Sequence, residues 1–138
     1  MKKLLTILLI IIAITATGRA QIVVIVHPSV PGSTIDNTSL VDIYMLSKTK
    51  WADDSPIRVF TLKKGSALVE RFYSPLGLNT LTLNKQWLRI QLTGEGRAPT
   101  AITEEEIVAR VAATPGAIGF VDPSQVTDKV KVLRQVNQ

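Results

Sequence analysis

The stretch I-R-V-F-T-L-K-K-G-S-A-L-V-E-R-F-Y at residues 57–73 decides the local fold from which the rest of the chain can be interpreted. Its first part, Arg58–Leu62, alternates and contains a valine and a phenylalanine, which predicts a β-strand. Residues 63–65 break the pattern with two lysines and a glycine. Ser66 is a favourable helix N-cap, and apolar residues follow at helical spacing. The stretch therefore predicts a strand, a tight basic turn and a helix.

The turn in this stretch has the chemistry of an anion site. A strand that enters a helix through a Gly-Ser turn points unpaired backbone N–H groups outward, and the helix dipole adds partial positive charge at the same place. Lys63 and Lys64 lie directly beside these groups. The alternative is an ordinary turn followed by a capped helix, which requires no ligand.

Residues 1–20 predict a secretory signal peptide. Two lysines follow Met1, residues 4–16 form an apolar run interrupted only by two threonines, and Gly18-Arg19-Ala20 supplies small residues at the positions that matter for cleavage. Cleavage is expected after Ala20. A membrane anchor is the alternative, but the apolar run is shorter than the roughly 20 residues that span a bilayer. The sequence has no cysteine, so we expect a periplasmic protein that is not a lipoprotein and has no disulfides.

Composition argues against several classes of function. Without residues 1–20, 13 of the 16 basic residues remain against 11 acidic ones, a net charge of +2. With so few aromatic residues and no long basic run, nucleic acid is not an expected partner. One histidine and no cysteine leave neither a histidine-based triad nor a thiolate nucleophile. The acidic pair Asp53-Asp54 lies among turn-forming residues, and the sequence shows no metal-ligating residues at the spacing of a metal site. We therefore expect no enzyme and no cofactor.

The remaining segments predict one α/β domain over residues 21–138. Residues 21–26 (Q-I-V-V-I-V) form a β-branched run typical of a central strand covered on both faces. A loop rich in Pro, Gly and Ser follows and places His27 and Ser29 at the carboxyl end of this strand, where open α/β sheets bind ligands.

Three further helices and two further strands are expected. The helices are predicted at residues 38–46, at residues 83–92 and from Thr103 onward, with Thr38 and Thr103 as N-caps and Glu106 completing a capping box. The strands are predicted at Ala117–Val121 and at residues 130–133. Gly119 inside the first of these strands predicts that another backbone or a ligand passes close to it.

Several short motifs follow one another along the chain in an order typical of one protein family. They are Ser39-Leu40-Val41-Asp42-Ile43-Tyr44, Trp51-Ala52-Asp53-Asp54-Ser55-Pro56-Ile57, Gly65-Ser66 before Arg71-Phe72, Trp87, Thr93-Gly94, Pro99, and Pro115-Gly116-Ala117-Ile118-Gly119-Phe120-Val121. Over most of residues 22–133 the chain resembles the periplasmic phosphate-type solute-binding proteins of ABC transporters, in a short, single-lobe version. The last motif, with the helix before it, is the most specific part of the resemblance.

The resemblance implies one lobe of a periplasmic-binding-protein-like (type II) fold, a mixed sheet flanked by helices. In the family, two such lobes close on an oxyanion, which is held by backbone N–H groups at helix N-termini, by hydroxyl groups and by an arginine. Carried over to this chain, the ligand-binding residues are Lys64, Gly65, Ser66 and Ala67, with Ser29 in the early loop.

The chain departs from the family pattern in two ways. The family turn commonly continues as Gly-Ser-Gly-Thr, whereas Ala67 and Leu68 follow Gly65-Ser66 here, so one hydroxyl donor is missing. Leu62 stands at the arginine position, and a lysine nearby is a point charge without the bidentate fork of a guanidinium. The chain also has about half the length that two lobes need. One lobe alone cannot enclose phosphate and exclude water from it.

Two functions of different classes are compatible with these residues. The first is an exported solute-binding-like protein that holds phosphate or a similar oxyanion, for an ABC transporter or as a sensor. Its partners would then be the membrane subunits of the transporter, or a second lobe. The alternative is an interaction or assembly module that kept the fold and lost the ligand. Leu68 at the family's hydroxyl position and the single lobe favour this alternative, in which the exposed face meets a partner or another copy of the chain.

Overall fold

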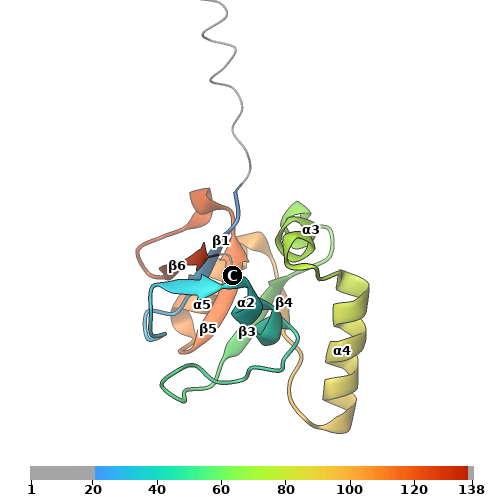
Figure 1. The fold of residues 1–138 in the computed structure, drawn as a ribbon. Helices are drawn as coiled ribbons and strands as arrows, with labels where there is room; N and C mark the ends of the chain where they lie inside the picture. Colours follow the sequence, from blue (N-terminus) through green and yellow to red (C-terminus); the bar gives the residue numbers. More distant parts are fainter. Residues whose placement is uncertain (1–20, 137–138) are drawn as a thin grey trace, which may run out of the picture.

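A computed structural model describes residues 21–136, which form one mixed six-stranded sheet of order β2-β6-β1-β5-β3-β4 (Figure 1). The strands are β1 (Val23–Val26), β2 (Thr34–Asp36), β3 (Arg58–Leu62), β4 (Thr100–Ile102), β5 (Ala117–Val121) and β6 (Lys131–Val136). The helices are α2 (Asn37–Tyr44), α3 (Ala67–Tyr73), α4 (Thr80–Thr93) and α5 (Glu104–Ala113). The predicted α/β class is confirmed. The predicted signal peptide lies outside the described residues.

The centre of the sheet is built from β1, β5 and β3. Every residue of β5 and the last three of β1 are buried, as their apolar runs predict. β5 is parallel to β3 but antiparallel to β1. The end of β1 therefore lies at the same edge of the sheet as the starts of β5 and β3, and their ends lie at the opposite edge. This orientation decides where the loop after β1 is placed.

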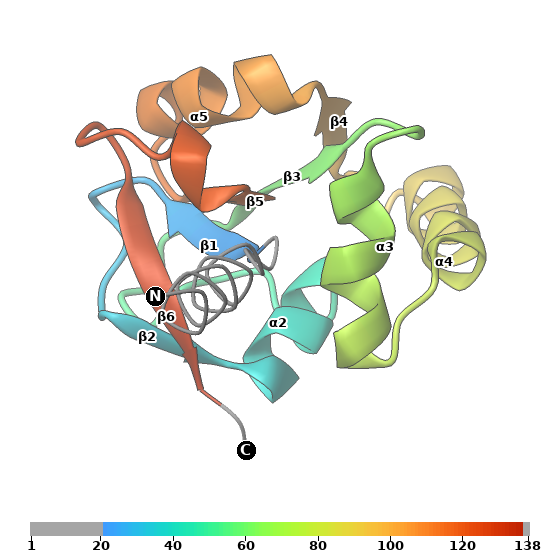
Figure 2. The ribbon, with the colours of Figure 1, turned by 90° about the horizontal axis from the view of Figure 1, so that it is seen from above.

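Helices cover both faces of the sheet (Figure 2). α5 packs on one face, while α2 and α3 pack on the other and α4 lies outside α3. Gly119 of β5 faces α5, and a Cβ added to it would lie 2.8 Å from Cδ1 of Ile107. The neighbour that passes close to this glycine is the side chain of a helix that lies directly on the strand, and not another backbone or a ligand as predicted.

An aromatic cluster fills the space between the sheet and the helices α2 and α3. Phe72 stacks on Phe120 with ring centroids 4.0 Å apart, and Tyr44 and Tyr73 contact this pair edge-on. The hydroxyl of Tyr44 donates to the Phe60 carbonyl at 2.9 Å, and the hydroxyl of Tyr73 lies 2.5 Å from Oγ1 of the buried Thr61. Burial raises the pKa of both tyrosines above the usual value, so both stay neutral near pH 7 and attach the helices to the middle of β3.

The structure corrects several element boundaries. α2 begins at Asn37, and its N-cap is Asp36, whose Oδ1 accepts from the Ser39 N–H at 2.6 Å, not Thr38. An aspartate at this position is a preferred cap, and hydrogen bonds from the side chain and the N–H of Ser39 lower its pKa. Thr103 does cap α5, but its side chain makes no capping hydrogen bond, so the predicted capping box is not formed. The short edge strands β2 and β4 were not predicted.

α4 is longer than predicted and differs from the other helices in its exposure. It begins at Thr80 after the cap Asn79, because the Asn79 side chain accepts from the Thr82 N–H at 2.8 Å. Its inner face buries Leu83, Trp87 and Ile90. Its outer face carries three leucines that are more than half exposed: Leu81, Leu88 and Leu92. None of the helices in residues 21–136 combines the length and the apolar character of a membrane span.

Candidate functional site

β3 has a candidate site at each end. At its carboxyl end lies the turn of residues 63–67, which is called the β3–α3 turn below. Gly65 has a φ of +97°, a left-handed conformation that favours glycine, and Ser66 is extended with φ −71° and ψ 128°. Oγ of Ser66 accepts from the Leu68 N–H at 3.2 Å. The predicted N-cap is confirmed, and it gives the turn a defined shape.

The β3–α3 turn presents unused donors to solvent. Within residues 21–136, the N–H groups of Gly65 and Ala67 donate to no backbone carbonyl, as is usual at the start of a helix. Lys63 and Lys64 are exposed and have no carboxylate partner in the described part of the chain, where the single ion pair joins Lys50 and Asp54. Leu68 is buried, so this apolar residue packs into the core and does not cover the turn.

Ser29 lies at the other end of β3. Its Oγ is 2.8 Å from Nδ1 of His27 and 3.4 Å from the Gly116 N–H, which immediately precedes β5. Arg58 pairs with Ala117, so this is the end at which β3 and β5 begin. The structure therefore brings Lys64, Gly65, Ser66 and Ala67 together in one turn but separates Ser29 from them by the length of β3. His27 is engaged by Ser29, whose N–H also donates to Nδ1 at 3.0 Å.

Two segments that are far apart in sequence, residues 51–58 and Gly116, contact each other closely at the amino end of β3. Nε1 of the buried Trp51 donates to the Gly116 carbonyl at 2.9 Å, and the Arg58 N–H donates to the same carbonyl at 3.1 Å. Gly116 has a φ of +78°, and a Cβ at this residue would lie only 2.3 Å from the Pro56 carbonyl oxygen. The contact of Trp51, Pro56 and Gly116 is called the Trp51–Gly116 interlock below. It explains why a tryptophan loop and a Pro-Gly motif far apart in sequence form one unit.

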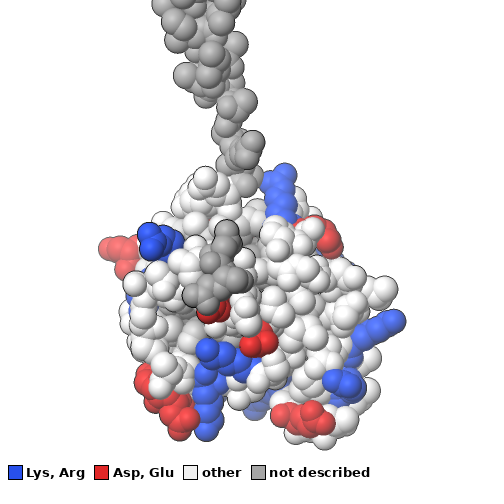
Figure 3. Space-filling view, viewed as in Figure 1, with Lys and Arg blue, Asp and Glu red and all other residues white. Residues whose placement is uncertain are grey.

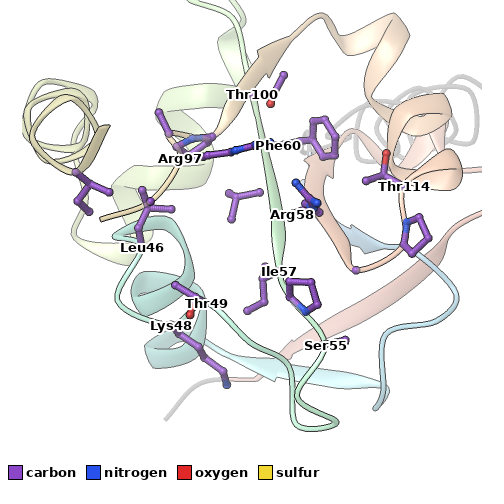
Figure 4. A pocket seen from close by; sticks show the side chains of 18 of the residues that line it. Leu46, Lys48, Thr49, Ser55, Ile57, Arg58, Phe60, Arg97, Thr100 and Thr114 are labelled. Carbon is purple, nitrogen blue, oxygen red and sulfur yellow. The ribbon is translucent and has the colours of Figure 1, made fainter. Parts of the chain in front are cut away.

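Beside the interlock lies a groove of about 920 Å³, called the β3 groove below. Residues from four separate segments border it: 46–49, 53–60, 95–100 and 114–116, together with Ser29 and Ile90. Its charged residues are Lys48, Asp53, Arg58, Glu95 and Arg97. Figure 4 shows Arg58 and Arg97 approaching this space from β3 and from the loop before β4.

The charges of the groove differ in how firmly they are held. Asp53 accepts from the side chain of Ser55 at 2.5 Å and from its N–H at 3.1 Å, and these bonds lower the pKa of Asp53. This carboxylate is therefore already engaged within its own turn. Arg58 and Arg97 have no carboxylate partner in the described residues. On the face drawn in Figure 3, acidic and basic side chains are interspersed among larger uncharged areas.

Sequence reasoning missed the β3 groove because its lining is assembled from distant segments. A second hollow of about 620 Å³ lies beside Glu70, Arg71 and Pro75 and contains none of the predicted site residues. Residues 21–136 contain no group of three or more metal-ligating side chains.

Solved structures with the same fold include proteins of phosphate transport. One from Clostridium perfringens, described as a phosphate ABC transporter substrate-binding protein, holds bound phosphate; it matches with a TM-score of 0.70 and 22% identity over 84% of this chain and 45% of its own. An ABC-type phosphate transport receptor from Vibrio cholerae matches with a TM-score of 0.67 and 19% identity, over 84% and 46%. PstS from Borrelia burgdorferi matches with a TM-score of 0.64 and 13% identity, over 84% of this chain and 47% of its own.

No protein-family model and no curated protein matches the sequence. The chain spans about half the length of the solved structures that it matches, as the predicted single-lobe resemblance requires. At these identities the similarity concerns the fold. The chain therefore has the fold of about one half of a phosphate ABC transporter substrate-binding protein.

Proposed function

We propose that this chain is an exported, periplasmic solute-binding-like protein that holds phosphate or a similar oxyanion at the β3–α3 turn, for an ABC transporter or as a sensor. The observation that carries the proposal is the turn itself. Among residues 21–136, it combines N–H groups of Gly65 and Ala67 that donate to no backbone carbonyl with two lysines that have no ionic partner. The fold is that of proteins of phosphate transport, one of which holds bound phosphate.

The exposure of the turn sets the expected strength of binding. Two unit charges 4 Å apart attract by about 1 kcal/mol in water but by about 4 kcal/mol where the effective dielectric constant is near 20. Lys63, Lys64, Gly65 and Ala67 are all exposed. In a single chain the attraction between this turn and an anion is therefore weakened by the surrounding water. We expect a dissociation constant on the order of 1 mM for a single chain, and tighter binding where a second lobe or copy covers the turn.

Calorimetric titration of the chain without residues 1–20 tests the proposal, with phosphate as ligand, sulfate as the comparison and low salt. In Ser66→Asp the side chain still caps α3, while its charge repels an anion. We expect this variant to lose at least about tenfold in affinity, which corresponds to about 1.4 kcal/mol. Lys64→Ala should lose less, and the exposed Lys129 on a distant loop supplies the control Lys129→Ala. No heat at about 10 mM phosphate, or equal binding by Ser66→Asp, would remove the turn as the site.

A second candidate function is self-assembly, and the outer face of α4 favours it. Leu81, Leu88 and Leu92 are 66%, 56% and 76% exposed, and their spacing of seven and four residues places them on one stripe of the helix. Clustered apolar side chains on a surface commonly mark interaction sites. The partner that this candidate assigns is a second copy of the chain, packed stripe against stripe.

Light scattering after size exclusion measures this assembly directly. If the stripe is the interface, Leu88→Glu should convert a dimer into a monomer. Thr82→Glu is the matched control, because Thr82 is exposed in the first turn of the same helix, where a carboxylate is favourable. A monomer at all concentrations, or a dimer that survives Leu88→Glu, contradicts assembly through α4.

A further inference from the structure

The outer face of α4 carries most of the exposed large apolar side chains of the described structure. Four such side chains are exposed in residues 21–136, and three of them lie on this helix: Leu81, Leu88 and Leu92. Figure 2 shows α4 outside α3, at the rim of the molecule. Apolar side chains that gather on one surface commonly mark a contact with a partner. This face is therefore a contact surface whose chemistry can identify the partner.

The inner face of α4 fixes the direction in which these leucines point. Leu83, Trp87 and Ile90 are buried, and Nε1 of Trp87 donates to the Tyr44 carbonyl at 2.6 Å. At about 3.6 residues per turn, positions 81, 88 and 92 lie on the side of the helix opposite to positions 83, 87 and 90. The helix is thus anchored through one face and presents its leucines outward on the other.

Two cations lie among the leucines. Lys85 follows Leu81 by four residues and precedes Leu88 by three, so it lies on the same stripe, and Arg89 comes about one turn later. The sequence of α4 contains no aspartate or glutamate. Within the described part of the chain neither cation has a carboxylate partner, and Arg89 donates to the side-chain oxygen of Gln86 at 2.5 Å. The stripe is therefore both apolar and positively charged.

Two carboxylates near α4 lie at its ends. Glu70 of α3 accepts from Oγ1 of Thr80, the first residue of the helix, at 3.3 Å. Glu95 follows the helix, and Arg97 comes soon after it. A second copy packed stripe against stripe would bring its own two cations against those of the first copy, since such a contact uses the same patch twice. An anionic surface pairs with all of them instead, so charge complementarity favours an anionic partner.

We propose that the outer face of α4 docks on the surface of an anionic lipid bilayer. The three leucines enter the apolar boundary of the bilayer, and Lys85 and Arg89 meet the phosphates of the lipid head groups. A lysine on such a stripe keeps its aliphatic stem on the apolar surface and its amine among the head groups. The contact is peripheral, because the 14 residues of α4 are too few to cross a bilayer. It uses none of the residues of the β3–α3 turn and does not depend on anion binding there.

Vesicle co-sedimentation tests this proposal with the chain without residues 1–20, because their apolar run would itself bind lipid. The probe is a vesicle of phosphatidylglycerol mixed with phosphatidylcholine, and the comparison is a vesicle of phosphatidylcholine alone. We expect at least about tenfold stronger binding to the anionic vesicle, since each cation near such a surface favours binding by about fivefold. Glycerol phosphate, which has the head-group phosphate but no acyl chains, should release no more protein than chloride at equal ionic strength.

The double variant Lys85→Gln with Arg89→Gln separates lipid from a second copy as the partner. It should weaken binding to anionic vesicles at least about tenfold, whereas it would strengthen a dimer by removing like charges from the seam. The matched control is Lys129→Gln with Arg134→Gln, which removes the same charge from exposed residues outside α4. This control should weaken vesicle binding by less than about threefold, because its cations lie away from the docked face.

A second pair of variants tests the leucines. Leu88→Gln with Leu92→Gln should weaken binding to anionic vesicles at least about tenfold, because the apolar contact is lost. Thr82→Gln, at an exposed position of the same helix, should not. Equal binding to both kinds of vesicle, release by glycerol phosphate beyond that by chloride, or full binding by either double variant of α4 would overturn the proposal. So would a dimer that persists, by chemical cross-linking, when anionic vesicles are added.

Discussion

At its carboxyl end β3 turns through an exposed glycine and a capping serine, whereas at its amino end a tryptophan and a proline of one segment are locked against a glycine of a distant segment. The first end is held by local contacts: Ser66 caps the helix that it precedes. The second is held by the hydrogen bond of Trp51 to Gly116, which are 65 residues apart. The difference separates two tasks, because the exposed end keeps backbone donors available while the locked end gives the sheet its shape.

The sharpest way to break the locked end is Gly116→Ala. The added Cβ would meet the Pro56 carbonyl oxygen at 2.3 Å, and the φ of +78° is unfavourable for any residue with a Cβ. We expect the free energy of unfolding, measured by urea titration, to fall by more than about 3 kcal/mol. The control is Gly94→Ala, since Gly94 has a similar φ of +74° but no atom within 4 Å of the added Cβ. Gly94→Ala should lower the free energy of unfolding by only about 1–2 kcal/mol. Equal losses in the two variants would show that the contact with Pro56 is unimportant.

The next largest effect is expected from Trp51→Phe. A phenylalanine keeps an apolar ring in the buried position but donates no hydrogen bond to the Gly116 carbonyl. The loss of this bond and of ring volume should reduce the free energy of unfolding by about 2 kcal/mol. The same urea titration measures it. In the double variant with Gly116→Ala, the loss in the free energy of unfolding should be smaller than the sum of the two single losses, because both changes act on one contact. Full additivity would contradict the interlock.

At the exposed end, Ser66→Ala should have a smaller effect on stability. Removal of the capping bond to the Leu68 N–H costs about 1 kcal/mol in other helices. Ser66→Asp should restore most of this stability, since an aspartate caps as well as a serine. Urea titration of the two variants tests whether the turn is shaped by its cap. If Ser66→Ala cost as much as Trp51→Phe, the contrast between the two ends of β3 would be wrong.

The smallest effect on stability at neutral pH is expected from the ionisation of Tyr44 and Tyr73, whose hydroxyl groups bond to the middle of β3. Burial raises the pKa of Tyr44 and Tyr73 in the folded chain, while the unfolded value is about 10. Their contribution is therefore complete below about pH 10 and is lost as the pH rises above it. Urea titrations between about pH 8 and pH 11 should show falling stability, and the fall should be smaller in Tyr73→Phe. An unchanged slope in that variant would mean that Tyr73 does not contribute.

Local signals were sufficient for the elements that form from neighbouring residues. The strand β3, the turn and α3 follow from alternation, a glycine and a capping serine, all within one short stretch. β2 and β4 were missed because each has only three residues and pairs at an edge of the sheet. Their conformation depends on distant partners, since β2 pairs with β6 and β4 with β3. Such pairing leaves little trace in the local pattern.

The candidate sites show the same division. Lys64, Gly65, Ser66 and Ala67 are adjacent in sequence, so their common turn was predictable. Ser29 was counted among the ligand-binding residues because the early loop resembles a family position near the ligand. The loop follows β1, which is antiparallel to β5, and nothing in the apolar run of β1 encodes that direction. The β3 groove was not predicted at all, since four separate segments border it.

The two indole hydrogen bonds have a consequence for optical measurements on this chain. The sequence contains two tryptophans, both buried, and each donates to a carbonyl: Trp51 to Gly116 and Trp87 to Tyr44. The first bond reports on the interlock, and the second reports on the seating of α4 against the end of α2. With Trp87 replaced by phenylalanine, the emission of Trp51 alone would follow the amino end of β3. The chain thus carries a separate fluorescent reporter for each of these two contacts.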